Sequence, residues 1–409
     1  MSEANYTYMD APFTVRDKWT GAVLDSENGN SYYAGVKLKF SSQINLGKMR
    51  LAIIAVLSHV RILSSSMKIE DDKLVMCLPS ESYIKEGLLN ELVLANGGTD
   101  QDFVNPNLSP FQNGLRLKYQ WDGEGHCFFI GFWTFTCDGL SIDLIINAII
   151  DCYEKGKFAI LYDKNSLLNI EKRSKYSNFV IEPEYFEKAS LNNHFRSIKN
   201  DLESRKSKTI TIDFEILEDE LRRVARRLGV TDFTIIFSLF QISISEICEL
   251  PTVITGVPFV NRYSLTELNT VGPFANTIPV LTSFPEKTKF IDKIFITQEA
   301  LLDSSQRQML DYSKYLPKGH KKLYNQIFNS WNAKLENKTI NLSDGNCLSI
   351  ELIHNGTVRS ELDITFGSSS SGSILGKFGF YCKNSEIVNF LIESIKQKFK
   401  ILKEEYDVR

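Results

Sequence analysis

The chain has 409 residues, of which 43 % are hydrophobic and 24 % are charged, and its formal net charge at pH 7 is -3. The length is sufficient for two or three domains of a soluble globular protein, and a charge so close to zero gives no general attraction to nucleic acid or to an anionic membrane. The first residues lack a basic segment followed by an apolar run, and no apolar run reaches ~18 residues, so we expect neither a signal peptide nor a membrane helix.

The cysteines favour free thiols over a disulfide framework. Seven is an odd number, and no two of them form a Cys-x-x-Cys pair, so the sequence predicts no zinc or other metal site. We therefore expect a cytoplasmic protein. The seven are Cys77, Cys127, Cys137, Cys152, Cys248, Cys347 and Cys382.

The N-terminal part alternates helices and strands. Apolar spacing predicts a helix over Leu46–Leu63, and Lys73–Leu78 is typical of a short strand. The run His126–Phe135 is too short for an average helix and is rich in aromatic residues, which favours a buried strand. Leu140–Tyr153 is apolar on nearly every side, which predicts a buried helix that ends at Gly156.

Polar residues from about 165 to 208 indicate a crossover between two halves. We expect an N-terminal lobe over 1–175, a crossover over 176–208 and a C-terminal lobe over 209–409. The second lobe begins with a predicted strand at Thr211–Phe214, and a helix face with Leu217 and Leu228 ends at Gly229. An apolar helix follows, starting near Thr231 and running to 247.

The remaining segments complete the second lobe. Pro251–Pro258 resembles a strand that leads into a loop, and 303–346 is polar. Ser368–Ser373 reads as a flexible linker. Three closing strands and one last helix are expected at Leu348–Ile353, Glu361–Phe366, Gly376–Tyr381 and Ser385–Glu405. Interleaved strands and helices in both halves predict an α/β protein with two lobes and a groove between them.

Three motifs now stand in order. Trp133-Thr-Phe-Thr-Cys-Asp138-Gly139 connects a strand to a helix, Gly256-Val-Pro-Phe-Val-Asn-Arg262 follows, and Val271-Gly-Pro-Phe-Ala-Asn276-Thr-Ile-Pro279 completes the set. This order resembles that of the condensation domains of nonribosomal peptide synthetases, whose core motif is His-His-x-x-x-Asp-Gly. The resemblance covers essentially the whole chain as one stand-alone unit. It implies two chloramphenicol-acetyltransferase-like lobes that form a V around a central groove or tunnel.

The resemblance also assigns site residues. Trp133 and Thr134 stand where the family has its two histidines, and the second of these faces the reacting groups. Thr134, Asp138 and Gly139 are therefore the candidate catalytic residues, although a threonine hydroxyl is no base near neutral pH and only forms hydrogen bonds. Trp133, Ser141, Arg262 and Asn276 are expected to support the site.

For most of these residues a structural role is the alternative. Thr134 is equally well a small filler beside a vacated pocket. In the family the aspartate of the motif pairs with the arginine that corresponds to Arg262, and such pairing favours the ionised carboxylate, which is a poor base at pH 7. A structural role is therefore preferred for Asp138, and somewhat preferred for Asn276. Gly139 is expected to let backbone approach closely in a turn.

Other candidates for the missing base are weaker. His126 lies eight residues before Thr134, roughly 26 Å along an extended strand. His59 reads as a helix-end residue, and Cys137 lacks a neighbouring base, so it is expected to be a small buried thiol. His194, His320 and His354 stand in polar or strand-edge surroundings; only His354 is considered able to reach the groove.

Two functions remain open from the sequence. The first is amide formation between a carrier-bound acyl thioester and an amine, without the usual histidine base. The second is a catalytically inactive scaffold that recruits or gates a carrier protein or tailoring enzyme. The resemblance implies no bound cofactor, the phosphopantetheine arm of an acyl or peptidyl carrier protein as substrate carrier, and a small amine or tethered aminoacyl group as acceptor.

Overall fold

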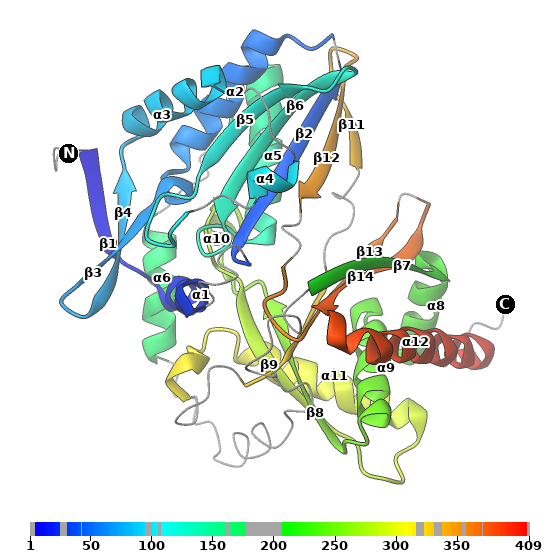
Figure 1. The fold of residues 1–409 in the computed structure, drawn as a ribbon. Helices are drawn as coiled ribbons and strands as arrows, with labels where there is room; N and C mark the ends of the chain where they lie inside the picture. Colours follow the sequence, from blue (N-terminus) through cyan, green and yellow to red (C-terminus); the bar gives the residue numbers. More distant parts are fainter. Residues whose placement is uncertain are drawn as a thin grey trace. The chain divides into compact units, whose positions relative to one another are not determined.

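The computed structural model describes residues 5–24, 31–41, 43–94, 100–104, 108–159, 164–176, 207–315, 323–330, 338–353, 357–369 and 371–406. The chain divides into two compact units, both built from sheets and helices (Figure 1). The first comprises Met1–Tyr176, Val260–Ala275 and Leu335–Thr357. The second comprises Ser177–Phe259, Asn276–Lys334 and Val358–Arg409.

This division corrects the expected lobe boundaries. We assigned all of 209–409 to the C-terminal lobe, but 260–275 and 335–357 belong to the first unit. The second of these segments forms a strand pair whose inner strand continues a sheet of the first unit, with Leu348 opposite Phe40. The expected crossover 176–208 lies almost entirely outside the described residues.

The main sheet of the first unit has five antiparallel strands in the order β11-β12-β2-β6-β5. β6 lies between β2 and β5 and is buried along almost its whole length, which explains its unbroken apolar sequence. The expected buried strand is thereby confirmed. The strand bounds are β2 Tyr33–Ser41, β5 Arg116–Trp121, β6 Gly125–Trp133, β11 Lys338–Asn341 and β12 Cys347–Ile353.

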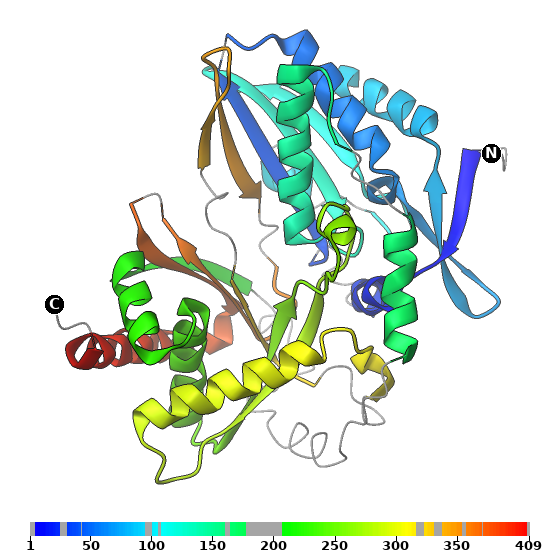
Figure 2. The ribbon, with the colours of Figure 1, turned by 180° about the vertical axis from the view of Figure 1, so that it is seen from behind.

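Helices lie on both faces of this sheet. α2 (Leu46–His59) and α5 (Gly139–Lys155) pack on each other on one face, as seen from behind in Figure 2, and α3 (Glu81–Leu94) packs beside α2. The short α4 (Asp100–Val104) covers part of the other face. The predicted apolar helix 140–153 is therefore confirmed within α5, which ends at Gly156 in the left-handed conformation, with φ 68°.

A small antiparallel sheet, β1-β4-β3, completes the first unit together with three more helices. The expected strand 73–78 is its central strand. The bounds are β1 Tyr6–Asp10, α1 Phe13–Leu24, the 3₁₀ helix η3 Arg61–Ser64, β3 Ser66–Glu70, β4 Lys73–Pro79, α6 Lys164–Tyr176 and α10 Leu265–Leu268.

The second unit is built on a six-stranded mixed sheet in the order β7-β14-β13-β10-β8-β9. β10 runs parallel to both β13 and β8, and the other pairs are antiparallel. The strands are β7 Ser207–Leu217, β8 Thr252–Phe259, β9 Asn276–Ser283, β10 Gln326–Ser330, β13 Leu362–Ser368 and β14 Ser373–Tyr381.

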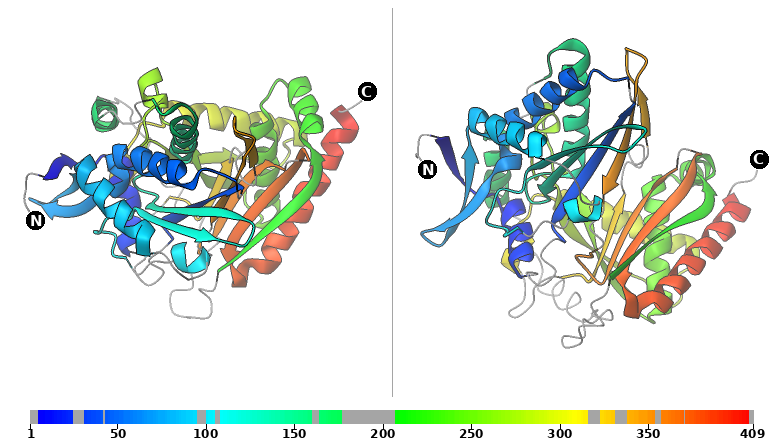
Figure 3. Two further views of the ribbon diagram at one scale, coloured as in Figure 1. Left: turned by 90° about the horizontal axis from the view of Figure 1, so that it is seen from above. Right: turned by 45° about the horizontal axis from the view of Figure 1, so that its top comes forward.

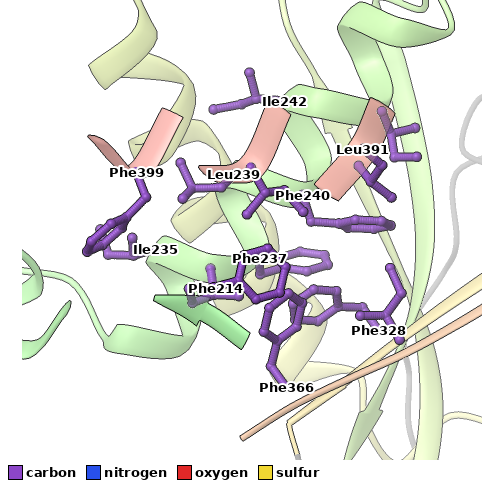
Figure 4. Close-up of a cluster of buried hydrophobic side chains, with 14 of the residues drawn as sticks. Phe214, Ile235, Phe237, Leu239, Phe240, Ile242, Phe328, Phe366, Leu391 and Phe399 are labelled. Carbon is purple, nitrogen blue, oxygen red and sulfur yellow. The ribbon is translucent and has the colours of Figure 1, made fainter. Parts of the chain in front are cut away.

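The core of the second unit lies between this sheet and the helix α9 (Asp232–Ile247). Phe237 and Phe240 of α9 place their rings 5.0 and 5.1 Å from that of Phe328 on β10, and Phe366 of β13 lies 5.2 Å from the same ring (Figure 4). α12 packs on α9 and against β14 (Figure 3). The other helices are α8 Glu218–Leu228, α11 Phe290–Gln306, α12 Ser385–Tyr406 and the 3₁₀ helices η5 Tyr312–Tyr315 and η6 Cys382–Asn384.

The polar stretch 303–346 contains the strands β10 and β11, and the predicted linker Ser368–Ser373 connects β13 to β14. In this connection the Ser369 N–H donates to the Ser373 carbonyl, and Gly372 adopts φ 82°. The hydroxyls of Ser369 and Ser373 lie 2.8 Å apart and bond each other.

Among the described residues, no single helix has the length and hydropathy of a membrane span. Only α8 and α9 taken together pass that test, and they are bent by 89° at their junction.

Candidate active site

The candidate site begins where β6 ends. The chain turns at 134–136, where both the N–H and the hydroxyl of Thr136 donate to the Trp133 carbonyl, at 2.9 and 2.8 Å. It then enters α5 with Asp138 as the N-cap, whose carboxylate accepts from the Ser141 N–H at 3.0 Å. An aspartate here satisfies a backbone donor, and its negative charge interacts favourably with the positive end of the helix dipole.

Asp138 is held by donors from three directions. Ser141 donates from its N–H and its hydroxyl to Oδ1, the latter at 2.7 Å. Arg262 Nη2 lies 2.9 and 3.0 Å from the two carboxylate oxygens. The N–H groups of Phe274 and Ala275 both donate to Oδ2 at 3.1 Å. Both oxygens of this carboxylate therefore accept several hydrogen bonds.

Arg262 is the buried cation that balances this carboxylate. Its side chain is 0 % exposed, and the expected pair with Asp138 is present. Nη1 donates to the carbonyls of Glu267 and Thr270, and the guanidinium carbon lies 4.0 Å from the centre of the Phe274 ring. Ser141 also joins the cluster, because its Oγ accepts from Arg262 at 3.0 Å and from the Gly272 N–H at 3.0 Å. All these residues belong to the first unit.

Thr134 stands immediately after β6. Its N–H donates to the Tyr32 carbonyl at 2.8 Å. Its hydroxyl oxygen is buried and has no hydrogen-bond partner among the described residues. A buried hydroxyl left without a partner costs about 1–3 kcal/mol.

Trp133 is a core residue. Its ring is fully buried, stacks on Phe135 at 5.2 Å and meets Tyr33 edge-on at 5.2 Å, while Nε1 donates to the Gln112 carbonyl at 3.1 Å. A Cβ added at Gly114 would lie 2.2 Å from this ring. The indole is therefore held rigidly in the core at the end of β6.

Comparison with known proteins agrees with this geometry. The sequence profile of the family described as "Condensation domain" matches residues 118–344, more than half of the chain. The protein belongs to the condensation-domain family. No curated protein matches the sequence.

Solved structures share the fold of this condensation domain. The condensation domain of the monacolin K polyketide synthase MokA matches with a TM-score of 0.74 at 11 % identity, covering 98 % of both chains. PapA2 acyl transferase matches with a TM-score of 0.72 at 13 % identity, covering 97 % of this chain and 96 % of its own. SgcC5 from Streptomyces globisporus matches with a TM-score of 0.68 at 12 % identity, covering 95 % and 98 %. At these identities the likeness establishes the α/β fold of the chloramphenicol-acetyltransferase type and leaves the reaction open.

Gly139 departs from expectation. A close approach of backbone was predicted there, but a Cβ built on Gly139 would meet nothing within 4 Å, and its φ is not in the left-handed region. The prediction is wrong because the residues that bond Asp138 approach the carboxylate side of the turn. Gly139 instead leaves open space at the first turn of α5 in the condensation domain.

Asn276 has a structural role in the second unit. Its side-chain amide donates to the carbonyls of Gln308 at 2.9 Å and Leu310 at 2.8 Å, which fixes the segment after α11 to the start of β9. Asn276 could hold a loop or touch a substrate, and the observed hydrogen bonds are those of a residue that holds a loop.

The described histidines and Cys137 do not join the site. His126 Nδ1 bonds the Tyr119 hydroxyl at 2.9 Å near the opposite end of β6, and His59 Nδ1 lies 3.0 Å from Glu81. His194, His320 and His354 lie outside the described residues. Burial raises the pKa of the Cys137 thiol well above its usual value, and the Asp138 carboxylate adds to that rise, so the thiolate is disfavoured.

Three charged residues lie near the site although no sequence pattern predicts them there. Lys18 of α1 donates to the Ala275 carbonyl at 3.2 Å. Arg173 of α6 pairs with the buried Glu267, next to Arg262. Each is a single charged residue in an ordinary polar context, and only the fold brings them to the Asp138 cluster. No group of three or more potential metal ligands occurs within the described ranges.

Proposed function

We propose that this condensation domain forms an amide between a carrier-bound acyl thioester and an amine, and that it does so without a histidine base. The observation that carries the proposal is the state of the β6–α5 turn. The carboxylate, arginine and serine of the motif form a buried network, and Thr134, at the position of the missing base, has a hydroxyl without a partner among the described residues.

The chemistry is compatible with such a site. A neutral amine is a good nucleophile, and a thiolate is a good leaving group, so proton removal contributes less here than it does for an alcohol. General-base catalysis is typically worth ~10²–10⁴-fold. Alignment of two bound reactants supplies effective molarities of ~10⁵–10⁸ M. Positioning alone therefore leaves room for a useful rate.

Thr134 would contribute a hydrogen bond in this mechanism. Its hydroxyl can accept from the attacking amine or donate to the thioester carbonyl, and either bond would satisfy an oxygen that has no partner among the described residues. The substrate carrier would be the phosphopantetheine arm of an acyl or peptidyl carrier protein, as the family resemblance implies.

The test is turnover with acyl-loaded carrier protein and a panel of amines, followed by mass spectrometry. We expect amide product above the rate without protein, with much slower or no ester formation from matched alcohols. The Thr134→Val variant keeps the shape and removes the hydroxyl, so it should lower the rate while leaving the unfolding midpoint at or above that of the parent protein. Absence of product across the panel would refute the proposal.

The alternative is a scaffold that binds a carrier or tailoring enzyme without chemistry. It is motivated by the same loss of histidine at positions 133 and 134. A scaffold would bind a carrier protein tightly with no turnover, and Thr134→Val would leave that binding unchanged. A fall in turnover in Thr134→Val would argue against it.

A further inference from the structure

The segment 260–275 carries a second buried ion pair besides that of Arg262. The side chain of Glu267 is only 3 % exposed, and its Oε1 is bound by Nη1 of Arg173. Its other oxygen, Oε2, accepts from the Tyr263 N–H at 2.7 Å. Both oxygens of this carboxylate are thus occupied, as both oxygens of Asp138 are.

Arg173 reaches the segment at more than one place. Its Nη2 donates to the Asn261 carbonyl at 3.4 Å, and its guanidinium carbon lies 4.7 Å from the centre of the Tyr263 ring. A planar guanidinium can hold a carboxylate, a carbonyl and an aromatic face at once. The neighbouring Glu171 fixes α6 in turn, because it accepts from the Phe13 N–H at 3.1 Å at the start of α1.

Glu267 connects the two ion pairs. Glu267 gives its side chain to Arg173 and its backbone carbonyl to Arg262, which also bonds the Thr270 carbonyl at 2.5 Å. The Ser264 hydroxyl caps the short α10 by accepting from the Glu267 N–H at 3.1 Å, so the residue has little freedom of its own. A displacement of Glu267 therefore displaces an acceptor that holds Arg262.

We infer that Glu267 and Arg173 are positioning residues that hold Arg262 in place against Asp138. Arg173 fixes the segment 260–275 to α6 through Glu267. The Glu267 carbonyl in turn accepts from Arg262 and so fixes the position of the Arg262 guanidinium. Arg262 then reaches the carboxylate and the Ser141 hydroxyl. The consequence for the reaction rests on the proposed function, whereas the coupling between the two ion pairs does not.

A double-mutant cycle on the unfolding equilibrium tests the coupling. Arg173→Met is combined with Ser141→Ala, which removes the hydroxyl that bonds Arg262, Asp138 and Gly272. No contact between residues 173 and 141 is observed, so independent effects would multiply. We expect instead that the double variant deviates from the product of the singles by at least about fivefold in the unfolding constant, because Arg262 links them.

The matched control cycle pairs Arg173→Met with Tyr153→Phe. Tyr153 lies near the other end of α5, where its hydroxyl donates to Asp344 at 2.6 Å, and no contact links it to Arg262. This cycle should be multiplicative within about a factor of two. Multiplicative behaviour in both cycles would overturn the inference, since Arg173 would then stabilise only α6 and its immediate surroundings.

Amide hydrogen exchange gives a second, independent readout. The N–H groups of Phe274 and Ala275 bond Asp138 directly. In Arg173→Met they should exchange at least about tenfold faster, while the amides in the middle of β6 keep their rates. In Arg173→Lys, which retains the charge, the increase should be smaller. Unchanged exchange at these two amides would contradict the inference. Neither measurement uses a substrate, so their failure is distinguishable from a failure of the proposed amide formation.

Discussion

Replacing the Asp138 carboxylate with an amide should destabilise the first unit strongly. In Asp138→Asn one carboxylate oxygen becomes an NH₂ group. If the oxygen is kept toward Ser141, the new donor faces three others, from Arg262, Phe274 and Ala275. Arg262 would then be a 0 % exposed cation without its counter-charge. Removing one partner of such a buried pair typically costs ~3–5 kcal/mol.

The measurement is thermal and urea-induced unfolding followed by near-UV circular dichroism, to which the buried Trp133 ring contributes. For a unit of this size each kcal/mol lowers the midpoint by about 2–4 °C, so a decrease of roughly 6–20 °C is expected. The matched control is Asp151→Asn on the same helix. Asp151 pairs with Lys155 at 2.6 Å, but it is 43 % exposed on its side chain, so the midpoint should barely change. Equal midpoints for the two variants would refute the claim that the Asp138 network holds the unit together.

Three further predictions follow from the same geometry. Gly114→Ala should destabilise the protein by about 1–3 kcal/mol, because the new methyl group would overlap the Trp133 ring. The control Gly87→Ala lies on the exposed side of α3, where nothing lies within 4 Å, and it should stabilise the protein by up to ~1 kcal/mol. Unfolding midpoints that move in the same direction in the two variants would contradict this prediction. In native protein N-ethylmaleimide should label the exposed Cys347 and Cys382 and spare Cys137 until denaturant is added, because burial keeps the pKa of the Cys137 thiol high. Rapid labelling of Cys137 at neutral pH, mapped by mass spectrometry, would show that this thiol is not buried. Thr134→His should raise the rate of amide formation by up to ~10²–10⁴-fold if the only missing component is a base, and a rate no higher than that of the parent protein would count against that reasoning.

The sequence predicted the strand and the helix start at the β6–α5 turn, because those residues obey local rules. A strand buried along most of its length is mostly apolar, as β6 is apart from His126, and an aspartate before an apolar helix is a typical N-cap, as Asp138 is. The order of motifs then placed Arg262 with Asp138. Those inferences depend on a few neighbouring residues or on a family pattern, and both are visible in one chain.

What the sequence did not reveal depends on contacts between distant segments. Nothing in 338–353 marks it as part of the first unit, since a strand carries no label for the strand it pairs with, yet β12 continues the sheet beside β2. The partnership of Arg173 with Glu267 spans 94 positions and uses two residue types that are usually solvated. The prediction for Gly139 failed because a glycine does not reveal which side of a turn other segments approach.

The hydrogen bonds of Asp138 constrain the mechanism of the proposed amide formation. Every donor around the carboxylate would have to be displaced or left unpaired before it could take a proton from an amine, and for buried charged groups that costs several kcal/mol. The hydroxyl of Thr134 cannot remove a proton near neutral pH. Under the proposed function neither residue supplies a base, and the rate would come from holding an already neutral amine against an activated thioester. That reasoning makes the rate follow the neutral fraction of the amine, so it should rise with pH up to the pKa of the acceptor and then level off. A plateau set instead near pH 6.5 for amines of very different basicity would indicate a histidine in the reaction and would contradict the proposal.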